Sequence, residues 1–140
     1  MKKKHKLGFK VKSVIVWDKM AHGMGDLKRQ YGPRYESVIF APGPKFAFPG
    51  RRPVDIVPVT KINSNKLVHP NEKPVPLMVK LIEDTTTPGA VLLDPFIGAG
   101  STAVAAIKTG RHFIGFELDP KYHEIAVNRV KAARKEIEGI

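Results

Sequence analysis

The feature that most constrains this chain is a glycine-rich turn in its second half. The apolar run from Ala90 to Leu93 predicts a short, buried parallel strand. It leads into Asp94 and then into a Gly98-x-Gly100-x-x-Ala pattern that opens a helix. Glycines at such a turn let the backbone approach a ligand closely, and the first turn of the helix presents free N–H groups. The order strand, glycine-rich turn, helix therefore predicts a site for a nucleotide-type ligand.

The residues that follow extend this turn into a strand–helix–strand–helix unit over residues 90–137. Residues 112–117 predict a second strand, parallel to the first, that ends at Glu117. An acid about 20 residues after the glycines suits hydrogen bonding to ribose hydroxyls. Asp119 is a suitable N-cap, and Pro120 a suitable first residue, for the last helix. A tight helix–strand contact would also explain such glycines, but the flanking strands and the placed acid favour a ligand.

The first half of the chain has a different, β-rich pattern. Residues 11–17 and 36–41 are rich in β-branched side chains and predict two strands, which could be antiparallel neighbours. Residues 54–62 alternate, but Pro58 limits them to an edge or irregular strand. Apolar residues recur at helical spacing from Pro74 onward, so a helix is expected to begin there.

Composition bounds the class of protein. A chain of 140 residues with a hydrophobic fraction of 42% fits a single globular domain. It contains no cysteine, which excludes disulfides and zinc–cysteine sites, and its histidines show no metal-ligand spacing. No apolar run approaches the ~18 residues of a membrane span, and no signal-peptide pattern follows the basic start at Lys2–Lys6. We therefore expect a cytoplasmic protein without a metal or a membrane partner.

The net charge of +11 is unevenly distributed along the chain. Residues 1–66 hold 15 Lys and Arg against 4 Asp and Glu, whereas residues 67–140 hold 9 against 9. All the excess positive charge therefore belongs to the first half. This asymmetry favours a polyanion as the partner of residues 1–66 and a small molecule as the partner of residues 67–140. A solvated, solubility-promoting surface is the alternative explanation.

Three motifs, in order, resemble a known family. The segment DPFIGAGST at residues 94–102 looks like the DPFxGxGST motif of bacterial and phage DNA methyltransferases that modify adenine N6 or cytosine N4. HPNEKP at residues 69–74 is similar to that family's HPxxKP element, and FIGFELDP at 113–120 to its FIGxExDP segment. Residues 8–19 and 35–41 resemble the two-strand region that precedes the target-recognition segment. A nicotinamide-binding half-domain is less favoured, because its strand normally runs into the first glycine without an inserted Asp-Pro-Phe.

The resemblance implies a fold, a cofactor and a set of site residues. The fold is a Rossmann-like α/β methyltransferase domain with an antiparallel strand pair in its N-terminal half, and the cofactor is S-adenosylmethionine. The loop at 94–102 would bind the cofactor, residues 69–74 would border its methionine end, and Glu117 would hold its ribose. The implied cofactor-binding residues are His69, Lys73, Pro74, Asp94, Pro95, Phe96, Gly98, Gly100, Ser101, Thr102, Glu117 and Leu118.

Double-stranded DNA is the partner expected for the basic half. Aromatic side chains among cations can stack on bases while the cations hold phosphates. Phe46 and Phe48 are such aromatics, although they could equally cover the edge of a core. The candidate DNA-binding residues are Lys45, Phe46, Phe48, Arg51, Arg52, Lys61 and Lys66.

One element of the resembling family is missing from this sequence. Its catalytic (Asp/Asn/Ser)-Pro-Pro-(Tyr/Phe/Trp) motif grips the target amine and the flipped base, and the 140 residues contain no Pro-Pro pair. The family's sheet would also lose its central strands, leaving the strand at residues 90–94 with an apolar edge. No catalytic residue is therefore assigned.

Three resolutions remain open for this incomplete sheet. The chain is the C-terminal piece of a split or truncated gene, it pairs with a second chain or with its own copy, or its two flanks close on each other. Two functions follow: part of a site-specific DNA methyltransferase, or a non-catalytic, DNA-binding remnant or regulatory partner of one.

Overall fold

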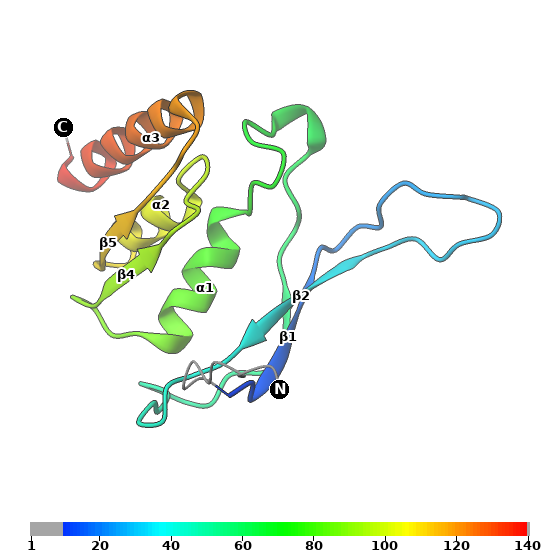
Figure 1. Ribbon diagram of the computed structural model, residues 1–140, viewed down its shortest axis with the longest axis horizontal. Coiled ribbons are helices and arrows are strands. Elements are labelled where there is room, and N and C mark those ends of the chain that lie inside the picture. Colours follow the sequence, from blue (N-terminus) through cyan, green and yellow to red (C-terminus); the bar gives the residue numbers. More distant parts are fainter. Residues whose placement is uncertain (1–9, 140) are drawn as a thin grey trace, which may run out of the picture.

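The chain forms two small β-sheets that share no hydrogen bond within the residues that the structure describes (Figure 1). The computed structural model describes residues 10–139, so the basic start at Lys2–Lys6 and the Gly8-Phe9 pair lie outside the described residues. The elements in chain order are β1 (Ser13–Asp18), β2 (Tyr35–Phe40), β3 (Ile56–Pro58), the 3-10 turn η1 (Ser64–Lys66), α1 (Val75–Thr85), β4 (Val91–Asp94), α2 (Ser101–Lys108), β5 (His112–Gly115) and α3 (Pro120–Glu138).

The first sheet has the order β2-β1-β3. β1 and β2 are antiparallel, with Val14 opposite Ile39 and Trp17 opposite Glu36, so the predicted strand pair is confirmed. β3 adds a parallel third strand on the other edge of β1. It is only three residues long and ends at Pro58, as expected for an edge strand that contains proline.

One face of this sheet packs against α1 to form a hydrophobic core. Trp17, Val57 and Leu77 are its buried centre, and half-buried side chains from β1 and α1 surround them. The indole Nε1 of Trp17 donates a 2.8 Å hydrogen bond to the carbonyl oxygen of Val59, which satisfies the one polar group of that side chain. The opposite face is open, with Val14 50% and Ile39 67% exposed.

The second sheet consists of β4 and β5, which are parallel. Leu93 lies opposite Ile114, and both are more than half exposed. The expectation that Ala90 to Leu93 would be buried as a parallel strand is therefore wrong for one face, since Val91 is 62% and Leu93 67% exposed. The physical reason is that, among residues 10–139, β4 pairs with β5 alone and one of its faces is uncovered, whereas Leu92 on the other face is half-buried.

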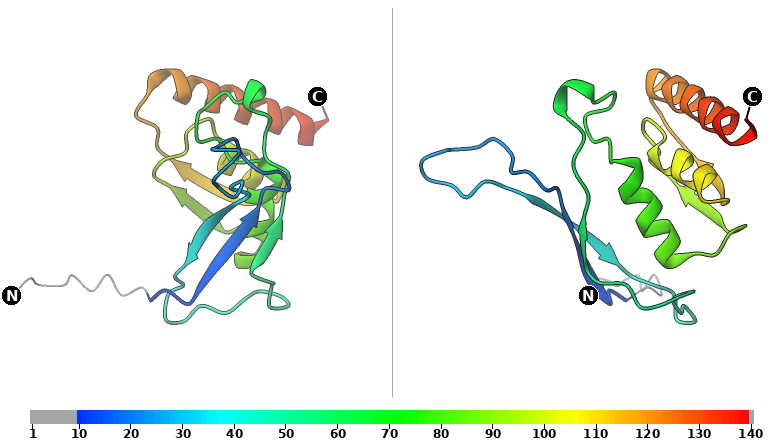
Figure 2. Two further views of the ribbon diagram at one scale, coloured as in Figure 1. Left: turned by 90° about the vertical axis from the view of Figure 1, so that its right-hand side faces the viewer. Right: turned by 180° about the vertical axis from the view of Figure 1, so that it is seen from behind.

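Small side chains let α2 pack between the other two helices. Ala103, Ala105 and Ala106 are completely buried, and α2 contacts both α1 and α3. α3 begins at its predicted N-cap, where the Asp119 side chain accepts a hydrogen bond from the backbone N–H of Lys121, and Pro120 is its first residue. Figure 2 shows α1 lying between the two sheets, with α2 and α3 beyond it.

A long arm connects β1 to β2 and projects away from the helices (Figures 1 and 2). Its base is fixed by the guanidinium of Arg34, which donates to both carboxylate oxygens of Asp18 at 2.7 and 2.8 Å. This contact lowers the pKa of Asp18 below its ordinary value. Within residues 10–139, no helix is long and apolar enough to cross a membrane.

The turn into α2 depends on Gly100, which has a φ of +84°. A Cβ added there would meet the Cβ and Cα of Ala126 on α3 at 3.0 and 3.1 Å. We predict that Gly100→Ala lowers the free energy of unfolding by roughly 3 kcal/mol, because left-handed strain and overpacking add. Urea unfolding followed by circular dichroism measures this loss.

Gly89→Ala is the matched control for this substitution. Gly89 has a φ of +83°, but a Cβ there would meet nothing within 4 Å. The control should lose only the strain cost of about 1–2 kcal/mol. Equal losses in the two variants would contradict a role for close packing between the turn and α3.

Candidate cofactor-binding site

A cavity of about 430 Å³ lies where the 69–73 segment meets the turn between β4 and α2. This volume falls within the usual range for small-molecule sites. The wall is built from the 69–73 segment, one residue of α1, the turn and first residues of α2, and the residue two positions after β5. The lining residues are His69, Asn71, Glu72, Lys73, Met78, Asp94, Phe96, Ile97, Gly98, Ala99, Ser101, Thr102 and Glu117.

Asp94 shapes the turn from the end of β4. One carboxylate oxygen accepts the backbone N–H of Phe96 at 3.0 Å, and the other accepts the hydroxyl of Thr102 at 2.6 Å. The side chain therefore connects the start of the turn to the first turn of α2. An acidic residue is required here because the contacts need two acceptors on one short side chain.

Glu117 holds the middle of the same turn from two residues beyond β5, which ends at Gly115 and not at Glu117 as the sequence predicted. Its Oε2 accepts the backbone N–H of Gly98 at 2.9 Å, and its Oε1 accepts the backbone N–H of Asp119 at 2.9 Å. An ionised carboxylate has about four acceptor positions, so these two bonds leave capacity for ligand hydroxyls. The predicted acid thus lies at the cavity, in contact with the glycine turn.

His69 covers the glycine turn from the other side. Its ring packs edge-on against Tyr122 of α3, with 4.3 Å between ring centroids. A Cβ on Gly98, whose φ is +54°, would lie 3.6–3.7 Å from the imidazole. The ring would tolerate a Cβ at this distance, so the positive φ of Gly98 is what favours glycine at the position.

An ion pair not anticipated from the sequence anchors the 69–73 segment. Arg129 of α3 donates to the Glu72 carboxylate at 2.7 Å and to the backbone oxygen of Ala99 at 3.0 Å. The side chain of Glu72 is only 6% exposed, and it also accepts the backbone N–H of Val68. One guanidinium thus joins the segment, the glycine turn and the last helix. The sequence signal was slight, because residues 57 positions apart in the chain form this pair.

A second ion-pair cluster connects the cavity to the first sheet. The Glu36 carboxylate of β2 contacts the Nζ atoms of Lys19 and Lys73, each at 2.7 Å. The two ammonium groups lie 5.5 and 5.6 Å from the centre of the Trp17 ring. Partial burial raises the pKa of Glu36, but hydrogen bonds from the two lysines outweigh this effect and hold it below its ordinary value of 4.5. The stability from these pairs is present above pH 4.5 and is lost as the pH falls through the lowered pKa.

Most of the predicted cofactor residues come together at this cavity. Phe96 lines it with a side chain that is 88% exposed, whereas Leu118, 97% exposed, does not line it. Pro74 is the N-cap of α1, and Gly100 that of α2. The predicted residues in the lining are His69, Lys73, Asp94, Phe96, Gly98, Ser101, Thr102 and Glu117; those outside it are Pro74, Pro95, Gly100 and Leu118.

Several lining residues were absent from the prediction. Asn71 and Glu72 lie inside the HPNEKP motif, which was the available signal for them, and Ile97 and Ala99 lie inside DPFIGAGST. Met78 comes from α1 and had no motif signal. The residues that sequence reasoning missed are Asn71, Glu72, Met78, Ile97 and Ala99.

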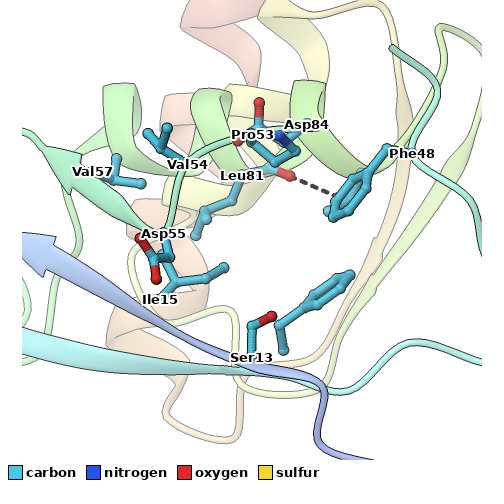
Figure 3. Close-up of a pocket in the computed structure, with 11 residues that line it drawn as sticks. Ser13, Ile15, Phe48, Pro53, Val54, Asp55, Val57, Leu81 and Asp84 are labelled. Atoms are coloured by element: carbon cyan, nitrogen blue, oxygen red, sulfur yellow. Dashed lines mark hydrogen bonds between the residues drawn. The ribbon is translucent and has the colours of Figure 1, made fainter. Parts of the chain in front are cut away.

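The predicted DNA-contacting residues all lie outside the cavity lining. Phe46 and Phe48 pack against Phe40 and against each other, with ring centroids 5.1–5.6 Å apart. Phe48 also lines a small hollow between β1 and the end of α1 (Figure 3). These contacts match the alternative in which the two rings cover a core edge. The exposed predicted cations are Lys45, Arg51, Arg52 and Lys66, and Lys61 is half-buried.

The carboxylates of the cavity are not arranged for a metal ion. Within residues 10–139, no group of three His, Cys, Asp or Glu side chains is placed to hold one. The oxygens of Asp94 and Glu117 instead bind groups of the turn and its neighbours.

Comparison with known proteins gives this geometry a family context. A family model described as "DNA methylase" matches residues 50–128. YubD of Escherichia coli (strain K12), which carries the name of a methylase, is 39% identical over 107 residues, covering 76% of this chain and 46% of that protein. The type II methyltransferase M2.DpnII of Streptococcus pneumoniae is 42% identical over 64 residues, which are 46% of this chain and 24% of that protein.

A solved structure shows the same fold. The crystal structure of an M1.HpyAVI–SAM complex matches with a TM-score of 0.76 and 31% identity, covering 88% of this chain and 63% of that chain. This chain therefore spans less than two thirds of each of these proteins. The family model covers more than half of the chain, includes the glycine turn and Glu117, and agrees with the structural match. The chain belongs to the DNA methylase family.

Proposed function

We propose that this chain binds S-adenosylmethionine at the cavity between residues 69–73 and the glycine turn. The observation that carries the proposal is the placement of Glu117, whose carboxylate touches the turn at Gly98 and keeps free acceptor capacity for ribose hydroxyls. The matched M1.HpyAVI structure, at 31% identity, is a complex of that protein with SAM. The cofactor would supply the methyl group, and this chain's residues would bind and orient it.

The cavity offers a suitable group for each end of such a molecule. Glu117 would accept from the ribose, and the exposed ring of Phe96 would offer an apolar surface to the adenine. Lys73 is the one lysine or arginine among the described lining residues, so it would face the carboxylate at the methionine end. The proposed cofactor site draws all its lining from residues 67–140, as the charge distribution suggested.

We predict that Glu117→Ala weakens S-adenosylmethionine binding at least tenfold, because ribose acceptors and a support of the turn are lost together. Isothermal titration calorimetry of the purified chain measures this change. Glu124→Ala, which removes an exposed carboxylate of α3, is the matched control and should bind like wild type. Absence of binding by the wild-type chain, or equal affinity of the Glu117 variant, would overturn the assignment.

We propose that the methyl group goes to an amino group of DNA, at adenine N6 or cytosine N4, as in site-specific modification by restriction–modification systems. The family match and the basic first half support this reaction. In this proposal, residues 1–66 contact double-stranded DNA in the cytoplasm. Because Phe46 and Phe48 are engaged with Phe40, cations such as Arg51 and Arg52 would provide most of the contact, through phosphates.

Replacing both Arg51 and Arg52 by alanine should weaken duplex DNA binding and reduce the slope of log K against log salt by about 2. Fluorescence anisotropy of a labelled duplex over a salt series gives this slope. The charge-matched control replaces Arg134 and Lys135, which are exposed on α3. The control should leave the slope unchanged, and an equal effect of both double variants would indicate only non-specific attraction.

We further propose that a second polypeptide supplies additional strands of the methylase fold, which would pair with the edges of the two sheets. Leu93 on β4 and Ile114 on β5 are exposed apolar residues of a parallel pair, although parallel sheets are normally covered on both faces. The matched relatives contain further chain outside the matched regions, which is the natural source of such strands. A second copy of this chain would supply the same strands again and no additional strands of the fold.

Co-expression with the part of YubD outside the matched 107 residues tests this partner. We predict a one-to-one complex by light scattering that transfers methyl groups to duplex DNA, and that Leu93→Asp disrupts the complex. Ile137→Asp, at an exposed apolar residue of α3, should not disrupt it. A homodimer, or no complex, would contradict this partner.

A non-catalytic DNA-binding or regulatory role is the second candidate, favoured by the absence of any Pro-Pro pair from the 140 residues. The same methyl-transfer assay separates the two functions. Turnover in the complex supports the enzyme, whereas cofactor binding without turnover under every condition supports the regulatory role. Turnover by this chain alone would exclude the regulatory role.

A further inference from the structure

We infer that Glu36 is a positioning residue for the cofactor site, holding the Lys73 ammonium at the cavity for the carboxylate of the cofactor. This inference rests on the proposed binding of S-adenosylmethionine and extends it to a residue of the first sheet. Glu36 lies in β2, 37 residues before Lys73 in the chain, and does not line the cavity itself. Its effect on the cofactor therefore has to pass through the lysine.

The geometry gives Lys73 a single fixed donor and leaves others available. An ammonium group has three N–H donors. One of them reaches the Glu36 Oε2 at 2.7 Å, and the same ammonium lies 5.6 Å from the centre of the Trp17 ring. Two donors then remain for the oxygens of a ligand carboxylate. Trp17 is 3% exposed and fixed by its bond to Val59, so the platform beneath the ammonium is rigid.

A flexible lysine needs such a restraint. The Lys73 side chain is 40% exposed, and a free lysine side chain loses up to about 2 kcal/mol of rotamer entropy when it is ordered. The existing contact with Glu36 meets part of this cost before the ligand arrives, which is how preorganisation increases affinity. Without Glu36, the ammonium would be free to turn into solvent.

The charge balance of the cluster also favours an anionic ligand. Lys19 and Lys73 share one carboxylate, so the three side chains together keep a net positive charge. Elsewhere, the cavity wall is acidic, with Glu72, Asp94 and Glu117 among the lining residues. A ligand carboxylate would therefore bind most favourably at Lys73. The negative charge of Glu36 offsets the repulsion between the two ammonium groups and keeps them close together.

The substitution that tests this role is Glu36→Gln. Glutamine keeps the length of the side chain but has only one acceptor oxygen, and it carries no charge, so it cannot restrain both lysines. We expect affinity for S-adenosylmethionine to fall about three- to tenfold in titration calorimetry. Affinity for 5′-methylthioadenosine, which lacks the methionine carboxylate, should stay within twofold of wild type. A merely structural role for Glu36 would weaken both ligands equally.

A double-mutant cycle shows whether Glu36 acts through Lys73. Lys73→Met should weaken S-adenosylmethionine binding by itself, and Glu36→Gln should cause no additional loss in that background. Glu124→Gln is the matched control, because it makes the same change at an exposed carboxylate of α3 that lies outside this ion-pair cluster. It should bind S-adenosylmethionine like wild type.

The outcomes distinguish this inference from the proposed function. No binding of S-adenosylmethionine by wild type would overturn the cofactor assignment itself. Normal binding by wild type with unchanged or tighter binding by Glu36→Gln would overturn only the role of Glu36. Additive losses in the Glu36 and Lys73 double variant would also overturn it, since they would show that the two residues act independently.

Discussion

The structure of the cavity depends on carboxylates that bind the backbone of one tight turn. Asp94 accepts from the N–H of Phe96 and from Thr102, and Glu117 accepts from the N–H of Gly98. Without these acceptors, the N–H groups of a turn with left-handed glycines would face a half-buried cavity unpaired, at a cost of about 1–3 kcal/mol each. The acids that a cofactor would need are thus also the groups that keep its site folded. Binding and folding are coupled at this turn, so any substitution of these acids changes both.

The structure of residues 90–138 was predictable because its strands, turn and helices follow one another directly along the chain. Each boundary has a local signal: Asp94 at the end of β4, Gly100 before α2, and Asp119 before Pro120 at the start of α3. The glycine turn, the acid beside it and the parallel pairing depend on short-range sequence and were predicted, although β5 ends two residues before Glu117. The burial of β4 was not, because burial depends on what covers a strand. A run of apolar residues indicates that a strand is most stable when buried. It does not show whether another element of the fold packs over that strand.

Contacts between distant segments account for most of what the sequence could not provide. Arg129 reaches Glu72, and Glu36 reaches Lys73, across 57 and 37 residues of chain. In the sequence, each of these is one charged residue among many, and solvent exposure is the usual state of such a residue. The aromatic residues show the converse. Phe46 and Phe48 lie among cations in the sequence, a pattern typical of nucleic-acid contacts. Their rings nevertheless pack with Phe40 over the edge of the first sheet. Whether such rings contact nucleic acid or pack over a core edge depends on which residues the folded chain brings next to them.

The two long-range ion pairs together connect the strand pair of the N-terminal half with the last helix of the C-terminal half through the 69–73 segment. Arg129 fixes the 69–73 segment to the last helix and the glycine turn, while Glu36 ties the end of that segment to the strand pair. The segment is therefore held from both sides, although few hydrophobic side chains lie within it. Its two anchors differ in exposure, because the Glu72 side chain is 6% exposed and that of Glu36 is 39% exposed. Loss of a partner costs more when the remaining charge is buried. The Arg129 contact therefore serves mainly to keep the segment folded, whereas the more exposed Glu36 contact contributes less to folding and leaves the Lys73 ammonium accessible to a ligand.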